Sequence, residues 1–262
     1  MSKLIFFDID GTLWDEKMQI PESTKETIHK LKDKGHLIFL CSGRARGNIR
    51  SKELLDLGFH GIIASCGNHI EMDGKILYER ILEPELTRIC VEILHRCHMP
   101  VVLEGPVCHW IDKEGFEDDP YVSYLFREMG ESAVLLEEYT PDIRINKFSG
   151  DVLPNTDYEE IKRVLSKEFD FIEHEGNVVE AVPKGTSKAT GIQWLCDYLK
   201  VPLCDTYGVG DSVNDLDMLG IVGHSIAMGN GMKAAKQAAE FITKDIHEDG
   251  IRYAMQHYGL IE

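Results

Sequence analysis

The chain has 262 residues, of which 43% are hydrophobic and 28% charged, as in soluble globular proteins and unlike disordered chains. There are 45 acidic and 28 basic residues, so the net charge is −17, and the sequence contains no run of lysine or arginine. Such a charge excludes nucleic acid and membrane surfaces as expected partners, and it repels phosphorylated metabolites unless cations or a metal ion are concentrated at one place.

The first part of the chain alternates short apolar segments with longer amphipathic ones. Strands are predicted at Leu4–Asp8, Leu37–Cys41 and Gly61–Ala64, and helices at Pro21–Lys34 and Lys52–Leu57. The strand segments are continuously apolar, which is expected when helices cover both faces of a sheet. Repeated strand–helix–strand order predicts an α/β fold with a doubly wound parallel sheet.

The pattern then changes to one with antiparallel signals. Met72-Asp73-Gly74 predicts a hairpin between strands 69–71 and 75–82, because Asp-Gly favours a tight turn. Helices are predicted at 84–98, 119–129 and 156–167, and strands at 100–105, 108–112, 143–149, 169–173 and 178–182, the last two joined by a turn at Glu175–Asn177. These segments indicate an α+β unit.

The first pattern returns near Gly185. A helix at 187–199, strands at 206–210 and 224–228, a helix at 232–239 and a strand at 241–243 complete the prediction. We therefore expect one core domain built from residues 1–82 and 184–262, with residues 83–183 forming a domain inserted into it.

Neither the N-terminus nor the cysteines indicate an extracellular protein. The apolar stretch from Leu4 to Phe7 is too short for a signal peptide or a membrane span, so we expect a cytoplasmic protein. The seven cysteines are an odd number and include no CxxC pair, which favours reduced thiols. The spacing of Cys90, Cys97–His98 and Cys108–His109 matches no closed zinc site.

Acidic residues follow two predicted core strands at opposite ends of the sequence. Asp8 and Asp10 come at the end of the first strand, and Asp211 and Asp215 follow the strand at 206–210. Ligands of open α/β sheets bind outside the carboxyl ends of the strands, and carboxylates there suit Mg²⁺. Each motif alone could be an Asp-rich turn, but their occurrence together at strand ends favours a metal and catalytic site.

Two further motifs are suited to binding phosphate. Ser42-Gly43 follows the second strand, where a hydroxyl and free N–H groups could hold phosphoryl oxygens, although an ordinary loop has the same composition. Lys188 lies at the start of the helix at 187–199, where a cation is disfavoured unless an anion is near. Lys188, or Lys184 just before it, is therefore expected to face a phosphate, and the alternative is a solvated surface lysine.

These four motifs, in this order, resemble those of the haloacid dehalogenase-like phosphatases. The inserted segment resembles the type II (C2) cap of the Cof-type, or IIB, branch, and the ending with Ala227-Met228-Gly229-Asn230 and Glu248-Asp249-Gly250 is similar to that of the same branch. The resemblance implies a Rossmann-like core with an α+β cap. It also implies a Mg²⁺-dependent phosphatase of small phosphorylated metabolites, most commonly sugar phosphates.

The resemblance also implies roles for individual residues. Asp8 would be the nucleophile that becomes an aspartyl-phosphate, and Asp10 the general acid and base. The implied metal ligands are Asp8, Asp10 (through its carbonyl) and Asp211, with Asp215 supporting the metal site; the implied phosphate-binding residues are Ser42, Gly43, Lys188 and Asn214. Cys66 stands where the family usually has asparagine, which removes a polar group at that position.

No motif of the inserted domain identifies its substrate, and only single residues are candidates for binding it. Arg44, Arg144 and Lys147 are candidate substrate residues, and Arg144 and Lys147 could bind a second anionic group of the substrate. Glu104, His109 and Trp110 also lie near cap strands and turns. Two alternatives to the phosphatase stay open: a sugar phosphomutase of the same fold, which would return the phosphoryl group to its substrate, and a sensor that binds a phosphorylated metabolite without turnover. The intact Asp8 and Asp10 pair disfavours the sensor.

Overall fold

The computed structural model describes residues 2–113 and 116–262 and divides them into two compact units. The first unit comprises the described residues up to Gly43 together with Arg50–Tyr78 and Ser187–Glu262. The second comprises Arg44–Ile49 and the described residues of Glu79–Thr186. None of the helices in the described residues has the length and hydrophobicity that a membrane span needs.

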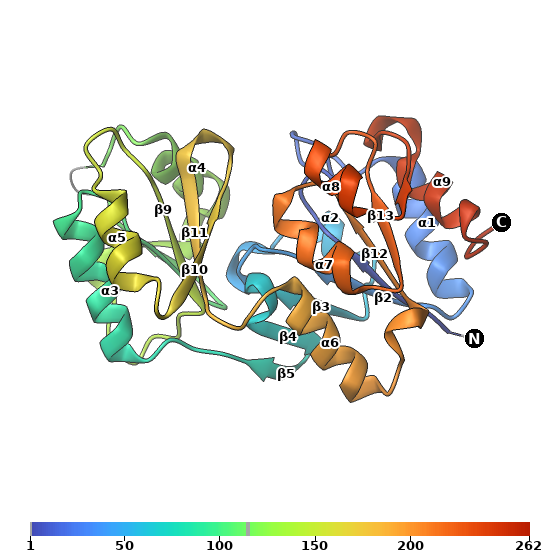
Figure 1. Ribbon diagram of the computed structural model, residues 1–262, viewed down its shortest axis with the longest axis horizontal. Coiled ribbons are helices and arrows are strands. Elements are labelled where there is room, and N and C mark those ends of the chain that lie inside the picture. Colours follow the sequence, from blue (N-terminus) through green and yellow to red (C-terminus); the bar gives the residue numbers. More distant parts are fainter. Residues whose placement is uncertain (1, 114–115) are drawn as a thin grey trace. The chain divides into compact units, whose positions relative to one another are not determined.

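The first unit is built on an eight-stranded sheet in which β1 is central. Figure 1 labels its strands β2 to β5, β12 and β13. The strand order is β14-β13-β12-β1-β2-β3-β4-β5. The strands are β1 (Leu4–Phe7), β2 (Leu37–Cys41), β3 (Gly61–Ala64), β4 (His69–Met72), β5 (Lys75–Glu79), β12 (Thr206–Gly210), β13 (His224–Ala227) and β14 (Phe241–Ile242). β1 pairs in parallel with β2 on one side and β12 on the other, so the carboxyl ends of these three strands meet at one edge.

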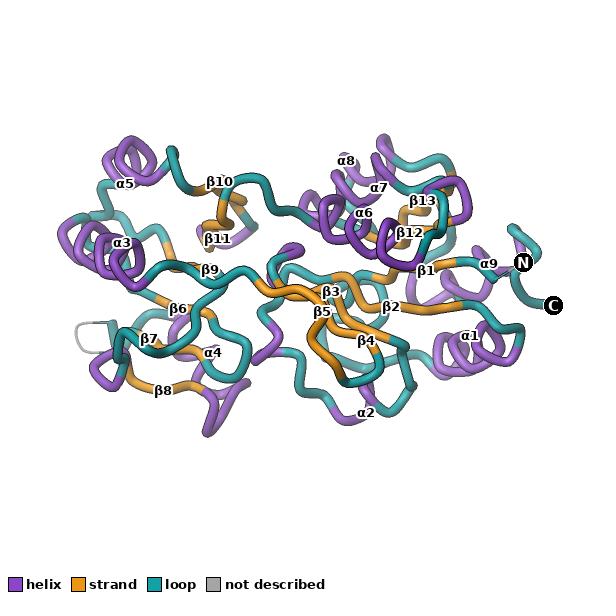
Figure 2. Tube along the Cα trace, turned by 90° about the horizontal axis from the view of Figure 1, so that it is seen from below, coloured by secondary structure: helices purple, strands orange, loops and turns teal. Residues whose placement is uncertain are grey.

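Helices cover both faces of this sheet, which confirms the doubly wound α/β fold. They are α1 (Glu22–Asp33), α2 (Lys52–Leu55), α6 (Lys188–Leu199), α7 (Leu216–Ile221), α8 (Lys233–Ala238) and α9 (Gly250–His257). Helices α6, α7 and α8 lie on one face, and α1, α2 and α9 on the other (Figure 2). The core is apolar, with the rings of Phe6 and Phe39 stacked at 5.5 Å between centroids.

The second unit is built on a six-stranded sheet with the strand order β10-β11-β9-β6-β7-β8. Its elements are α3 (Pro84–Arg96), β6 (Val102–Glu104), β7 (His109–Ile111), α4 (Pro120–Met129), β8 (Ala133–Leu135), β9 (Lys147–Asp151), α5 (Tyr158–Leu165), β10 (Phe169–Glu173) and β11 (Val178–Pro183). Residues of α3 and α5 pack around Phe148 and Phe169. Residues of α4 pack instead on Val102 and Ile111, so the sheet is covered on both faces.

Three elements were not predicted from the sequence, and each has a local reason. Strand β8 has three residues and is defined by its parallel pairing with β7 rather than by its own pattern. Helix α7 has six residues, and its Gly220 lowers helix propensity. Helix α9 begins at Gly250 directly after Asp249, a dipeptide that in isolation indicates a turn.

Candidate active site

Neighbouring parallel strands bring the two predicted acidic motifs together. The N–H of Asp8, just after β1, donates to the carbonyl of Val209 in β12 at 2.9 Å, and Asp211 directly follows β12. One carboxylate oxygen from each of Asp8, Asp211 and Asp215 lies within 4.8 Å of the others. The structure therefore places these three predicted residues in one cluster at the carboxyl edge of the sheet.

Lys188 supplies the cation of this cluster. Its Nζ atom lies 2.6 Å from Oδ1 of Asp8 and 2.6 Å from Oδ1 of Asp215. It lies 3.4 Å from Oδ1 of Asn214. The side chain is almost fully buried, and it is held at the first position of α6 by the capping box of Ser187 and Thr190. The alternative of a solvated surface lysine is therefore wrong for this position.

Asp215 holds the turn that carries Asp211. Its Oδ2 atom accepts the backbone N–H groups of Asp211 at 2.9 Å and Ser212 at 3.0 Å, while Oδ1 contacts Lys188. Gly210 leaves room for this carboxylate, since a Cβ atom at residue 210 would lie 2.5 Å from Cγ of Asp215. The position of Asp211 thus depends on a buried aspartate and on the absence of a side chain at residue 210.

The cluster holds three carboxylates around one ammonium group. Burial and the charge of Asp215 raise the pKa of Asp8 well above its usual value, although Lys188 opposes them. Burial, followed by the charge of Asp215, raises the pKa of Asp211 to about 7. Burial lowers the pKa of Lys188, but the attraction of Asp215 and Asp8 outweighs it, so the net shift is upward. The site is therefore short of positive charge, and a divalent cation that prefers oxygen donors fits it.

The loop after β1 is held by contacts that the sequence did not indicate. The indole Nε1 of Trp14 donates to Oδ1 of Asp10 at 2.9 Å, and the hydroxyl of Thr12 donates to Oδ1 of Asp211 at 3.1 Å. Gly11 has a φ of +75°, and a Cβ atom there would lie 2.5 Å from Oδ2 of Asp211. No pattern in the sequence indicated either contact, and Thr12 reaches an aspartate 199 residues farther along the chain.

Ser42 and Gly43 follow β2, next to β1 in the sheet. Ser42 is buried, and its N–H donates to the carbonyl of Ile63 at 2.9 Å. Its carbonyl accepts the N–H of Cys66 at 3.2 Å, and Cys66 has a left-handed φ of 51°. Burial raises the pKa of the neighbouring Cys41 thiol well above its usual value, so this cysteine is a neutral buried group and not a thiolate nucleophile.

The three candidate substrate residues lie in the second unit and pair with glutamates. Nη1 of Arg44 lies 2.6 Å from Oε1 of Glu128, and Arg144 pairs with Glu79. Lys147 is fully buried, with Nζ 2.9 Å from Oε1 of Glu104 and 3.2 Å from Oε1 of Glu180. A substrate contact by Lys147 would require part of this buried network to open, whereas the side chain of Arg144 is 55% exposed.

The family model of haloacid dehalogenase-like hydrolases matches residues 5–255 of the chain. The chain belongs to this family. It is 33% identical to YkrA of Bacillus subtilis (strain 168), which is named as a candidate phosphatase, over 100% of this chain and 99% of that protein. It is also 28% identical to YitU of the same organism, named as 5-amino-6-(5-phospho-D-ribitylamino)uracil phosphatase, over 97% of each chain.

Solved structures of the family have the same fold. The subclass IIB sugar phosphatase BT4131 superposes with a TM-score of 0.84 at 27% identity, covering 99% of this chain and 100% of that one. A hypothetical protein of Geobacillus kaustophilus HTA426 superposes with a TM-score of 0.87 at 29% identity, over the full length of both chains. The predicted membership of subclass IIB is confirmed, and the protein is a phosphatase of the haloacid dehalogenase-like family.

Proposed function

We propose that this phosphatase is Mg²⁺-dependent and hydrolyses phosphate monoesters of small metabolites through an aspartyl-phosphate on Asp8. The observation that carries the proposal is the cluster of Asp8, Asp211 and Asp215 around the buried ammonium of Lys188. Such a cluster provides a nucleophilic carboxylate, a cation for phosphoryl oxygens and an excess of negative charge suited to a divalent metal ion.

In the first step, an oxygen of Asp8 attacks phosphorus and the bond to the leaving alkoxide breaks. Asp10 gives its proton to that alkoxide, so a neutral alcohol departs and an acyl phosphate remains on Asp8. Trp14 orients Asp10 for this proton transfer through its hydrogen bond to Oδ1. The exposed position of Asp10, compared with the buried Asp8, fits a group that meets both the leaving alcohol and water.

In the second step, the acyl phosphate is hydrolysed. A water molecule attacks phosphorus, and the carboxylate of Asp10 takes one proton from it as the bond to Asp8 breaks. Inorganic phosphate leaves, Asp8 returns to a carboxylate and Asp10 is again protonated. The same residue thus acts as acid and then as base.

The remaining residues position the phosphoryl group. Lys188, Ser42 and Asn214 would bind its oxygens, together with the N–H groups near Gly43. The carboxylates of Asp8 and Asp211 and the backbone carbonyl of Asp10 would hold Mg²⁺, with Asp215 keeping Asp211 in place through two N–H groups. When bound, the cation would neutralise charge on the oxygens of the phosphoryl group.

The substrate class is proposed to be sugar phosphates, with flavin-related phosphates as the next class to test. The name of BT4131 as a sugar phosphatase supports the first class, and that of YitU, a 5-amino-6-(5-phospho-D-ribitylamino)uracil phosphatase, supports a test of phosphates with a heterocyclic ring. We propose that the inserted segment 83–183 acts as a cap that selects the leaving group, with Arg44 and Arg144 binding a second anionic group of the substrate. The cytoplasm is the proposed location, in keeping with the seven cysteines being free thiols.

Phosphate release from sugar, nucleotide and cofactor phosphates, for wild type and Asp8→Asn with Mg²⁺, tests the proposal. We expect release by wild type alone, loss of that release in excess chelator, and recovery when Mg²⁺ is restored. Isomerised sugar phosphate in place of free phosphate would assign a phosphomutase. Tight binding without release would assign a sensor.

A further inference from the structure

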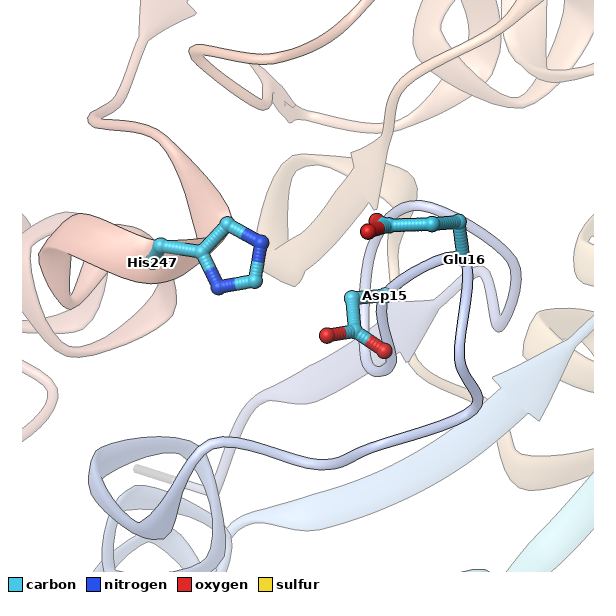
Figure 3. Close-up of side chains that lie close together, drawn as sticks. All are labelled: Asp15, Glu16 and His247. Atoms are coloured by element: carbon cyan, nitrogen blue, oxygen red, sulfur yellow. The ribbon is translucent and has the colours of Figure 1, made fainter.

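A second group of potential metal ligands lies outside the cluster at Asp8. Asp15 and Glu16 belong to the loop after β1, and His247 belongs to the short 3-10 helix Ile246–Glu248 after β14. One donor atom of each lies within 4.8 Å of the other two. In Figure 3 the two carboxylates and the imidazole ring point toward a common space, although their segments are far apart in the sequence.

Asp15 is held in place independently of any ligand. Its Oδ1 atom accepts the backbone N–H groups of Lys17 and Gln19, both at 2.9 Å, and the residue is 9% exposed. These N–H groups, that of Gln19 first, also hold the pKa of Asp15 below its usual value, so the group is a carboxylate at neutral pH. Oδ2 of Asp15 makes none of the hydrogen bonds found in the described part of the chain, so it is available to a cation.

The segment that carries His247 is tied to the same loop by Asn230. Oδ1 of Asn230 accepts the N–H of Ile246 at 2.9 Å, and its Nδ2 donates to the carbonyl of Gly11 at 2.7 Å. The N–H of His247 donates to Oδ1 of Asp245 at 2.9 Å. The backbones on both sides of the three donors are therefore fixed before any ion binds, which lowers the entropic cost of binding one.

The charges around these donors favour a cation. Within the described residues, no lysine or arginine nitrogen lies within ion-pair distance of Asp15 or Glu16, unlike many other acidic groups of the chain. The chain as a whole carries a net charge of −17, which also favours a cation over an anion.

We propose that Asp15, Glu16 and His247 bind a divalent transition-metal ion, with Zn²⁺ as the expected ion. An imidazole with two carboxylates suits Zn²⁺, whereas Mg²⁺ prefers oxygen donors throughout, as in the cluster at Asp8. Metal–ligand distances of about 2.0–2.2 Å would draw the donors together by a fraction of an ångström to about one. Glu16 and His247 are exposed and can make that movement, while solvent completes the coordination.

The ion would join the loop after β1 to the C-terminal segment that follows β14. Asn230 already links these two segments by hydrogen bonds, so the ion would add a second link farther along the loop. Its main effect would therefore be on stability. The proposal does not depend on the phosphatase mechanism, because none of its three ligands belongs to the cluster at Asp8.

Calorimetric titration of metal-free protein with Zn²⁺, in the presence of excess Mg²⁺, tests the site. We expect wild type to bind one Zn²⁺ that is lost, or weakened at least about tenfold, in both His247→Ala and Glu16→Gln. Zn²⁺ should raise the Tm of wild type but not of these two variants. Asp15 is left unchanged because its carboxylate also holds the loop.

His29→Ala is the matched control, because His29 is an exposed histidine on α1 and should not affect binding. Substitution of Co²⁺ gives a second measurement, since its visible absorption should change in His247→Ala when a nitrogen ligand is lost. Equal stoichiometry and affinity in wild type and both variants would place the ion elsewhere and overturn the proposal. Failure of the wild type to bind Zn²⁺ at all would overturn it equally.

Discussion

The Nζ atom of Lys188 lies 2.6 Å from Oδ1 of Asp8, and both side chains are almost fully buried. Lys188→Met removes the ammonium group that contacts Asp8 and Asp215 and leaves both carboxylates buried without it. Because breaking a buried ion pair costs about 3–5 kcal/mol, we expect a loss of that size in the free energy of unfolding, together with loss of turnover. Urea denaturation and phosphate release measure the two effects.

Lys184→Met is the control for this variant, since Lys184 is an exposed lysine shortly before the same helix. It should change neither stability nor turnover appreciably. We also expect added Mg²⁺ to stabilise Lys188→Met more than it stabilises wild type, because the metal would replace part of the missing positive charge. Equal stabilisation of both proteins by Mg²⁺ would contradict the placement of the metal at these carboxylates.

Replacement of the proposed nucleophile should separate catalysis from stability. Asp8→Asn removes the attacking oxygen, so we expect turnover to fall about a thousandfold or more. Its Tm should be unchanged or higher, because a neutral amide relieves the repulsion of the buried carboxylates. Asp33→Asn, an exposed aspartate on α1, is the matched control. An Asp8→Asn protein with wild-type rates would exclude Asp8 as the nucleophile.

Alanine variants of two glycines separate the displacement of Asp215 from the general effect of an added methyl group. In Gly210→Ala the new Cβ meets Cγ of Asp215 at 2.5 Å, so the aspartate or the strand must move. We expect a loss of about 1–3 kcal/mol in stability and a fall of about a hundredfold in kcat. A Cβ at Gly220 meets nothing within 4 Å. Gly220→Ala should therefore stabilise helix α7 by about 0.5–1 kcal/mol and leave kcat unchanged.

The stability that Glu104 contributes in the second unit should change with pH in opposite directions in wild type and in Lys147→Met. Burial would raise the pKa of Glu104, but Lys147 and His109 outweigh it and hold this pKa well below its usual value. In wild type the resulting stabilisation is present above the unfolded pKa of about 4.3 and is lost as the pH falls toward the lower folded value. Denaturant unfolding across this pH range measures the loss.

Lys147→Met leaves the buried Glu104 and the half-buried Glu180 without their shared cation. At neutral pH we expect it to cost about 3–5 kcal/mol. Burial would then raise the pKa of the two glutamates, so part of the loss should be recovered as the pH falls and they become neutral. Lys167→Met, at an exposed lysine of the same unit, should be without effect. If the loss of stability in Lys147→Met does not become smaller at lower pH, it is caused by lost packing and not by charge.

Much of the first unit could be predicted because its strands and motifs have local signals. The apolar segments at Leu4–Phe7 and Tyr207–Val209, with the aspartates that follow them, predict a cluster at one sheet edge. The contact of Trp14 with Asp10 and the burial of Lys188 between two aspartates had no such signal. The first is a contact between two side chains four residues apart in one loop, and the second depends on packing between segments distant in the sequence.

The second unit was harder to predict at the level of side chains. Lys147 follows a polar stretch and looks like a surface cation, yet its strand pairs with β6 and β11 and buries it between two glutamates. Strand β8 has no pattern of its own beyond three residues. Both depend on strand pairing, which periodicity along one segment does not indicate.

The pairing of β1 with β12 also sets when the protein can become active during its synthesis. Strand β1 ends at Phe7, whereas its partner β12 begins at Thr206. At a translation rate of roughly 5–20 residues per second, the ribosome needs about 10 to 40 seconds to make the intervening chain. Asp8 is present throughout that interval, whereas Lys188 is made late in it and Asp211 only after β12. A nascent chain therefore has no complete phosphatase site until Asp211 is made. Until then, one edge of the apolar strand β1 has no partner strand.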